Sequence, residues 1–342
     1  MEGFEKGKLQ ASSSIRDAVK IINDGKIHIA LVVDENDKLI GTITDGDVRR
    51  GILKGYSLND NCKKIMKKDF RSVSISSQKN AFNIMEMEEL KQIPVLDKNG
   101  KIADVIVKNN QLNNQCSDLP VIIMAGGKGS RLGNLTKTIP KPMLEVAGKP
   151  MIDIVIANCK EAGFKKFFIS VNYLKECIIK HLSDGKNFGI EIKYIEENFP
   201  MGTGGALSIL PTINRPLLVI NADVLTKVDL RRLVEFHFHQ DSSLTLCSRK
   251  IETNVPYGVI MSDGPKVTSI KEKPIIKHNI NAGVYLINPE ITNNLPKNTK
   301  LDMTDIVSYS LKKNLNVNLF PIHEYWLDVG VPETFTQANG EW

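Results

Sequence analysis

The sequence predicts an α/β protein that is built from two unlike parts. The first part repeats itself, because AVKIINDGKIHIALVVDENDKLIGTI (18–43) compares with AFNIMEMEELKQIPVLDKNGKIADVI (81–106). A polar stretch rich in Asn and Gln, KNNQLNNQCSD (108–118), follows the repeat. After it, apolar strands alternate with helical segments, a pattern typical of a mostly parallel sheet that is covered on both faces.

Each copy of the repeat contains a helical segment, a short apolar strand that ends in Asp, a turn and a second strand. The two aspartates are Asp34 and Asp97. Neither copy is large enough to bury a good core alone, so we expect the two to pack on each other. The expected boundaries are 1–57 for the first copy, 61–112 for the second, 113–119 for a linker and 120–342 for the second part.

The repeat resembles a pair of CBS modules, a family that binds adenine or guanine nucleotides and often regulates an attached enzyme. The family's ligand signature places Thr or Ser three residues before Asp, and GTITDGDVRR (41–50) supplies Thr44 and Asp47. The second copy is degenerate, with Val107 and Asn110 at these places. The resemblance implies a regulatory nucleotide at Thr44 and Asp47 and a homo-oligomer formed through the CBS modules. A module that only dimerises is the alternative.

The second part begins with VIIMA (121–125), a continuous apolar run expected of a strand that is buried on both faces. Helices are expected at 150–164, 174–182 and 228–240, and strands at 167–171, 190–197 and 217–224. The strand-rich segments SLTLCSRK, YGVIMSD, KVTSIKEKP and NAGVYLINPE then suggest an antiparallel extension over the first sheet. In such folds, ligands bind beyond the carboxyl ends of the parallel strands.

The first strand runs directly into a basic, glycine-rich loop, AGGKGSRLG (125–133). It is not a Walker A loop, because Gly129 follows Lys128 where Ser or Thr belongs. It is not a dinucleotide fingerprint, because Leu132 takes the place of the last glycine. Small residues let backbone N–H groups approach phosphates, and Lys128 and Arg131 can neutralise them. The rigid PKP (140–142) fixes the position of Lys141.

The longer string MAGGKGSRLGNLTKTIPKPMLEVAGKPM (124–151) resembles the signature of nucleoside-triphosphate:sugar-1-phosphate nucleotidyltransferases. The resemblance continues through EENFPMGTGGAL, LLVINADVL, YGVI, KEKP, NAGVY and WLDVGVPETFTQAN to the end of the chain. It implies a Rossmann-like, GT-A-like domain with a mostly parallel mixed sheet over 120–342.

The same resemblance implies the residues of the site. Arg131 would hold the triphosphate, Lys141 would bridge the α-phosphate and the sugar phosphate, and Asp223 and Asp328 would hold Mg²⁺. The nucleotide-binding set is Ala125, Gly126, Gly127, Gly129, Ser130, Glu197, Gly202 and Thr203. The sugar-phosphate set is Gly258, Glu272, Lys273 and Asn281.

Glu197 bears on the choice of base. A carboxylate only accepts hydrogen bonds, and guanine offers two adjacent donors, so GTP is the expected nucleotide. The combination with CBS modules resembles the glucosamine-1-phosphate guanylyltransferases of legionaminic acid biosynthesis, which implies glucosamine 1-phosphate as the acceptor. The alternatives are a mannose- or heptose-1-phosphate guanylyltransferase, a transferase that uses UTP or dTTP, and, in another class, a non-catalytic CBS nucleotide sensor.

The composition favours a cytoplasmic protein. The net charge of +6 is spread over both parts, which gives little support to nucleic-acid binding. The five cysteines are scattered and form no CxxC pair, and neither a signal peptide nor a membrane span is expected. His237 and His239 are spaced i,i+2 on an expected helix, so they are expected to pack or to face solvent rather than to bind a metal.

Overall fold

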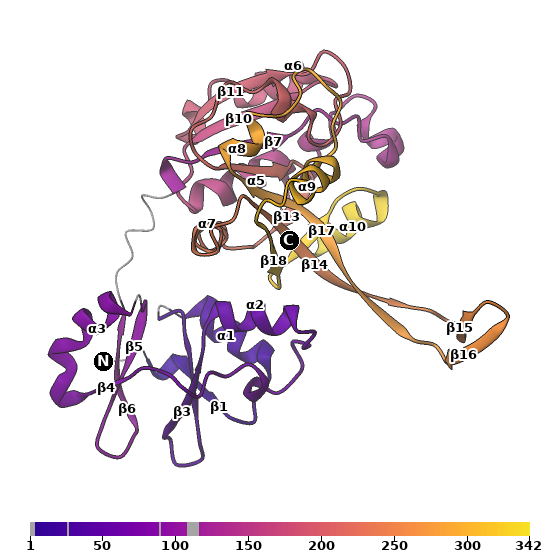
Figure 1. Ribbon diagram of the computed structural model, residues 1–342. Helices are drawn as coiled ribbons and strands as arrows, with labels where there is room; N and C mark the ends of the chain where they lie inside the picture. The colour runs from indigo at the N-terminus through magenta and orange to yellow at the C-terminus, as the bar shows by residue number, and fades with distance from the viewer. Residues whose placement is uncertain (1–3, 26, 89, 108–115) are drawn as a thin grey trace. The chain divides into compact units, whose positions relative to one another are not determined.

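The computed structural model describes residues 4–25, 27–88, 90–107 and 116–342. The chain divides into two compact units, residues 1–111 and 112–342, each with its own hydrophobic core (Figure 1). Residues 113–115 of the expected linker lie outside the described residues. Within its described end, Cys116 and Leu119 are buried in the core of the second unit. The narrower boundaries of the two CBS modules and the linker stay a prediction.

The first unit contains two small sheets of the same design. Its strands are β1 (Lys8–Gln10), β2 (Ala30–Val33), β3 (Leu39–Ile43), β4 (Val73–Ser74), β5 (Gln92–Leu96) and β6 (Ile102–Val107). Its α-helices are α1 (Ile15–Asp24), α2 (Asp45–Leu53) and α3 (Ala81–Met87). The sheets are ordered β1-β2-β3 and β4-β5-β6, and in each the first pair is parallel and the second antiparallel. The internal repeat read from the sequence is therefore confirmed.

Local signals in the sequence explain where the helices of the first copy begin. Ser14 and Asp17 form a capping box before α1, and Thr44 and Asp47 form the same motif before α2. Because α1 buries Ile15, Ala18 and Ile22, the helix packs its apolar face on the β1–β3 sheet.

The second unit is organised around one seven-stranded sheet in the order β11-β10-β7-β12-β17-β14-β18. The strands of this unit are β7 (Pro120–Met124), β8 (Glu145–Val146), β9 (Lys149–Pro150), β10 (Lys166–Val171), β11 (Glu191–Glu196), β12 (Leu217–Asn221), β13 (Val224–Thr226), β14 (Leu244–Asn254), β15 (Val259–Asp263), β16 (Lys266–Lys271), β17 (Ile275–Ile287), β18 (Val317–Ile322) and β19 (Trp326–Asp328). β11, β10, β7 and β12 are mutually parallel, and β17 is antiparallel to both β12 and β14. A mostly parallel mixed sheet was expected and is confirmed.

Helices cover both faces of this sheet. They are α5 (Met151–Glu161), α6 (Lys175–Leu182), α7 (Leu230–His239), α8 (Pro289–Thr292), α9 (Met303–Lys312) and α10 (Pro332–Glu341). The side chains of β7 alternate between two cores, with Val121 and Ile123 in one and Ile122 in the other. This double burial explains the continuous apolar run at 121–125. Within the part of the chain that the structure describes, no helix combines the length and apolar character needed to cross a membrane.

The strand-rich segments behave differently from the expectation. β14 and β17 do not lie over the first sheet; they join its edge and then continue away from it as a two-stranded ribbon (Figure 1). The ribbon is paired from Arg249↔Ile280 to Asn254↔Ile275 and ends in the separate hairpin β15–β16. Residues 249–280 are called the arm from here on.

Candidate active site

The glycine-rich loop leaves β7 at the carboxyl end of the parallel strands, and Gly129 fixes its path. Gly129 has φ 63°, and a Cβ there would lie 2.9 Å from Cβ of Lys141. The Thr136 hydroxyl donates to the carbonyl of Gly129 at 3.0 Å, which closes the turn. Lys141 is therefore held against the loop and is 7% exposed, with its ammonium group directed at a carboxylate.

Two aspartates meet at this end of the sheet. Asp223 follows β12, and Asp328 ends β19, which pairs with β13 so that Val224 lies opposite Asp328. The amide of Val329 donates to the carbonyl of Asp223 at 3.0 Å. The β13–β19 pair thus places Asp223 and Asp328 side by side, although they are far apart in sequence.

Two cations complete this group. The Lys141 ammonium forms an ion pair with the Asp223 carboxylate. A Cβ at Gly330 would lie 3.2 Å from an Asp328 carboxylate oxygen and 3.3 Å from an Arg131 guanidinium nitrogen, so these two side chains flank the same glycine. The structure therefore brings together all four of the residues that were expected to be catalytic.

The surroundings of Asp328 disfavour the charged form of its carboxyl group. Loss of hydration raises the pKa of Asp328 above 3.8, and the neighbouring charge of Asp223 raises it further. Lys141 and Arg131 oppose this shift only in part. Two adjacent carboxylates are a suitable oxygen donor set for a divalent cation.

Glu197 lies directly after β11, across from the start of the loop. Its carboxylate accepts from the Ser170 hydroxyl and, at 3.3 Å, from the amide of Met201. A Cβ at Gly126 would lie 2.7 Å from the same carboxylate, and Ala125 is tied to Ser170 by a 3.0 Å backbone hydrogen bond. The carboxylate is thus fixed beside the expected nucleotide loop.

Two further residues of the nucleotide-binding set pack against the beginning of α9. The Thr203 amide donates to the Asp302 carboxylate at 3.0 Å, and its hydroxyl accepts from the amide of Met303 at 3.0 Å. A Cβ at Gly202 would lie 2.6 Å from the carbonyl of Leu301. These contacts hold the second loop in place.

The remaining loop residues lie on the more open side. A Cβ at Gly127 would meet nothing within 4 Å, and Ser130 opens the 3₁₀ turn Ser130–Thr136. The Lys128 ammonium lies 5.9 Å from the centroid of the Tyr173 ring. The Tyr173 hydroxyl donates to the carbonyls of Thr136 and Lys137 at 3.0 and 3.1 Å, which anchors this ring to the loop.

The sugar-phosphate set is divided between the body and the arm. Asn281 lies on β17 at the base of the arm, where its side chain bonds to the Tyr285 hydroxyl. Gly258 and Glu272 lie at the outer end, where a Cβ at Gly258 would be 3.1 Å from the Glu272 carboxylate. Six residue steps of strand, about 20 Å, separate Ile275 from Asn281, and Lys273 lies beyond Ile275. The structure does not bring Gly258, Glu272 and Lys273 to the carboxylates of their own chain.

The sequence of the second unit matches the nucleotidyl transferase family model over residues 120–342, and residues 8–54 match the CBS domain model. The chain belongs to the nucleotidyl transferase family. The match covers the whole of the domain that carries these four charged residues.

Several curated relatives resemble this nucleotidyl transferase domain. The mannose-1-phosphate guanyltransferase of Yarrowia lipolytica is 32% identical over 235 residues, 64% of this chain and 62% of the relative. The catalytic subunit beta of mannose-1-phosphate guanylyltransferase from Drosophila melanogaster is 30% identical over 230 residues, 63% of this chain and 60% of the relative. The chain thus spans about three fifths of the length of these relatives.

Solved structures share the fold. The structure described as a putative glucose-1-phosphate thymidylyltransferase from Bacillus anthracis matches with a TM-score of 0.54 and 25% identity, over 65% of this chain and 94% of that one. HddC from Yersinia pseudotuberculosis, complexed with GMP-PN, matches with a TM-score of 0.51 and 26% identity, over 65% of this chain and 99% of that one. Each match covers 65% of this chain, about the share that the nucleotidyl transferase domain, residues 120–342, makes up.

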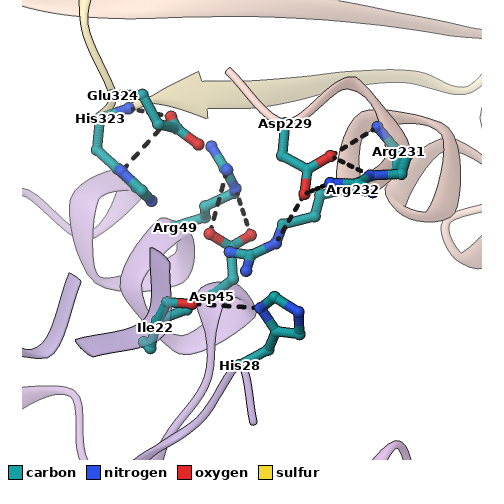
Figure 2. A network of polar contacts seen from close by, with 9 residues as sticks. All are labelled: Ile22, His28, Asp45, Arg49, Asp229, Arg231, Arg232, His323 and Glu324. Carbon is teal, nitrogen blue, oxygen red and sulfur yellow. Dashed lines mark hydrogen bonds and ion pairs between the residues drawn. The ribbon is translucent and has the colours of Figure 1, made fainter. Parts of the chain in front are cut away.

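In the CBS unit, the two expected ligand residues are engaged with each other. The Thr44 hydroxyl donates to the Asp47 carboxylate at 2.6 Å, and Arg50 pairs with the other oxygen of Asp47 at 2.6 Å. Arg49 pairs with Asp45 at 2.7 Å, as Figure 2 shows. A nucleotide would have to compete for these groups. Asn110, one of the two departures in the second copy, lies outside the described residues.

Some residues of the site carried no sequence signal. Ser170 and Tyr173 contact Glu197 and the glycine-rich loop, and Asp302, the N-cap residue of α9, contacts Thr203. Ser and Tyr near a strand end and Asp at a helix N-cap are common, so none of the three stood out in the sequence. His237, by contrast, follows the expectation: its ring bonds to Thr245 and Asn288 and is buried in packing. The pair of Asp229 and Arg231 in Figure 2 is likewise structural, because Asp229 caps α7.

Proposed function

We propose that this chain transfers a nucleoside monophosphate from a nucleoside triphosphate to a sugar 1-phosphate and releases pyrophosphate. One observation carries the proposal: Arg131, Lys141, Asp223 and Asp328 converge at the carboxyl ends of the parallel strands. An isolated Asp or Lys would have a structural explanation. A cluster of two cations and two carboxylates beside a glycine-rich loop, with Lys141 buried and Asp328 exposed, is suited to binding phosphates.

The chemistry requires positioning and charge neutralisation. An oxygen of the sugar phosphate attacks the α-phosphorus, the bond from that phosphorus to the bridging oxygen of pyrophosphate breaks, and pyrophosphate takes the electron pair. The attacking oxygen is already anionic, so no general base is needed. At ~4 Å, two like charges repel by about 4 kcal/mol at an effective dielectric of roughly 20. Arg131 would neutralise the triphosphate and Lys141 the α-phosphate and the sugar phosphate.

Mg²⁺ is the proposed cofactor, held by Asp223 and Asp328. The donor set fits, because both residues offer hard oxygen ligands and Asp328 lies beside a second carboxylate, that of Asp223. When bound, the metal would neutralise phosphate charge at the reacting centre. With another cation at the carboxylates, the Lys141 ammonium, which is now paired with Asp223, is free to turn toward the phosphates.

GTP is the proposed donor nucleotide. The Glu197 carboxylate is fixed by Ser170 and Met201, and each of its oxygens keeps a lone pair to accept from the N1–H and N2–H₂ donors of guanine. Uracil or thymine would place a carbonyl oxygen against it. The curated relatives named as guanyltransferases and the relative complexed with GMP-PN support the same choice.

The acceptor is proposed to be a hexose 1-phosphate. The curated relatives favour mannose 1-phosphate. The attachment of CBS modules favours glucosamine 1-phosphate, as in the guanylyltransferases of legionaminic acid biosynthesis, and both belong in the first assay. A heptose 1-phosphate is the next candidate.

The rival proposal is a non-catalytic nucleotide sensor with a CBS unit that regulates a partner. Such a protein has no need for Lys141, Asp223 and Asp328 to converge, and their convergence favours the enzyme. A regulatory nucleotide at Thr44 and Asp47 is compatible with either proposal.

A substrate panel tests the function. The full chain is incubated with Mg²⁺, each of four nucleoside triphosphates and each candidate sugar 1-phosphate, and pyrophosphate release is measured. We expect release to depend on a sugar 1-phosphate and to be highest with GTP. A strong preference for UTP or dTTP would remove the assignment of the base, and no release with any pair would remove the enzyme.

The variant Asp223→Asn tests the cluster. It keeps the side-chain shape but loses the charge that pairs with Lys141 and holds the metal, so turnover should fall by at least about 10²-fold. Asp229→Asn is the matched control, because Asn caps a helix as well as Asp does and α7 should be retained. Near-normal turnover of Asp223→Asn would mean that the metal site lies elsewhere.

A further inference from the structure

The arm exposes an unusual amount of apolar surface. Six of its large apolar side chains are between 55% and 74% exposed. Side chains of this kind are usually buried in a folded protein. They are Tyr257, Ile260, Met261, Val267, Ile270 and Ile275. β15 and β16 pair with each other in a sheet of two strands, and a hairpin of that size is at best marginally stable in water by itself.

Part of this surface forms one face that also carries expected substrate ligands. Ile260 lies directly opposite Ile270, and the register shift after Met261 places Val267 opposite Ser262, on the same side. A Cβ at Gly258 would lie 3.5 Å from Ile270 and 3.1 Å from Glu272, so Gly258 and Glu272 border the same face. The opposite side of the hairpin carries Met261.

The body of the same chain cannot cover this face without unfolding the arm. The ladder between β14 and β17 is continuous from Ser248↔Asn281 to Asn254↔Ile275, and both strands run on into the central sheet. The direction of the arm is therefore set by the core. To reach its own Asp223 and Asp328, the arm would have to turn back sharply along a ribbon that is paired over its whole length.

We propose that the arm docks on the nucleotidyl transferase domain of a second copy of this chain and completes the active site there with Gly258, Glu272 and Lys273. The identity of the completed site rests on the proposed function. A two-fold arrangement satisfies both arms at once, because each copy gives and receives the same element. Ile260, Val267 and Ile270 are the apolar anchors of the contact.

The charge of the arm fits this occupant. Its residues, 249–280, contain six Lys and Arg side chains and three carboxylates, a net charge of +3. At the acceptor surface, Lys141 and Arg131 balance Asp223 and Asp328, so the anionic sugar phosphate that joins them there makes the surface negative. Lys273 then meets the sugar phosphate from the side opposite Lys141, which is the arrangement that two mutually repelling anions require.

A cross-linking experiment tests the contact whether or not the protein is an enzyme. The photoreactive residue p-benzoylphenylalanine replaces Ile260 in the full chain, and an isotope-labelled copy is mixed with an unlabelled one. We expect cross-links from position 260 of one copy to residues within 120–342 of the other. The same probe in place of Met261, on the opposite side, should give fewer. Cross-links only within one copy, only to the first unit, or no more numerous than those from position 261 would overturn the proposal.

Two mixed dimers test whether the arm acts in trans. A dimer of Asp223→Asn with Lys273→Ala keeps one intact site only if the arm crosses, so it should regain about half of wild-type turnover. At a sugar-phosphate concentration well below the KM of Lys273→Ala, a dimer of wild type with the double variant D223N/K273A should be nearly inactive if the arm crosses and half-active if it does not. Lys273→Ala alone should raise the KM for the sugar phosphate, with Lys266→Ala at the hairpin turn as control.

The outcomes separate the two proposals. Full activity of Lys273→Ala, or the half-active result with the double variant, overturns the exchange of arms and leaves the transferase intact. A wild-type chain that releases no pyrophosphate overturns the transferase, and the cross-links then decide the arm contact by themselves.

Discussion

The carboxyl group of Asp328 is surrounded by groups and burial that disfavour its charged form. Burial and the neighbouring Asp223 raise its pKa above 3.8 in the folded chain, so the folded state retains a proton at a pH where the unfolded state has released it. Stability therefore falls as the pH rises through this window, and the deficit remains at higher pH. The carboxyl is partly solvated, which limits the effect to less than about 1 kcal/mol.

Asp328→Asn should therefore stabilise the metal-free protein while it removes activity. The gain in the free energy of unfolding should grow as the pH is raised from 4 to 8, measured by chemical denaturation. Asp263→Asn, an exposed carboxyl at the β15–β16 turn, controls for the loss of one charge. Added Mg²⁺ should reverse the order, because only the parent gains from binding it. A variant less stable than the parent without metal at pH 8 would contradict this account.

Glu197→Gln should change the choice of base. The amide turns a donor toward guanine, where the carboxylate accepts, so kcat/KM for GTP should fall by about 10- to 100-fold relative to UTP. Glu196→Gln is the matched control, because Glu196 pairs with Lys175 at the surface. An unchanged ratio of GTP to UTP in Glu197→Gln would show that this carboxylate does not read the base.

Part of the site could be predicted from the sequence, and the rest required the structure. The strings around Arg131, Lys141, Asp223 and Asp328 could be found without a structure, because each places a charge at a fixed step from a glycine, a proline or a strand end. The Lys141–Asp223 ion pair could not, because a spacing of 82 residues says nothing about distance in space. Ser170 was missed because its role depends entirely on Glu197 lying opposite.

The loop after β7 is the element whose shape decides where Lys141 lies. Gly129→Ala should reduce turnover sharply, because the new Cβ meets Lys141 at 2.9 Å and must displace it. Gly148→Ala is the matched control: it has φ 74° and nothing within 4 Å, so it adds backbone strain of about 1 kcal/mol without a clash. Steady-state turnover and thermal unfolding of both variants separate misplacement from strain. Equal turnover in the two variants would contradict a positioning role for Gly129.

The arm is the element that the sequence described least well. Its strands were foreseen from their composition, and an antiparallel extension was correct as far as pairing goes. Whether an added strand lies over a sheet or continues its edge depends on twist and on a bulge, here between Leu246 and Ser248, and neither leaves a clear pattern in the residues. Large exposed apolar residues at alternate positions look, in the sequence, like those of a buried strand.

At the scale of the whole molecule, two units with separate cores should respond separately to heat. Among the described residues, the apolar clusters of residues 1–111 and those of residues 112–342 share no member, so we expect two calorimetric transitions.

GTP with Mg²⁺ at ~100 times its Kd should stabilise the nucleotidyl transferase domain by about 2.7 kcal/mol, which raises its unfolding temperature by roughly 5–10 °C for a domain of this size. Lys141→Ala should abolish that shift and leave the transition of the CBS unit in place. A shift of the CBS transition in both proteins would instead report a nucleotide at Thr44 and Asp47. A single cooperative transition whose midpoint temperature rises with GTP would contradict independent units, because binding at one site would then stabilise both units together.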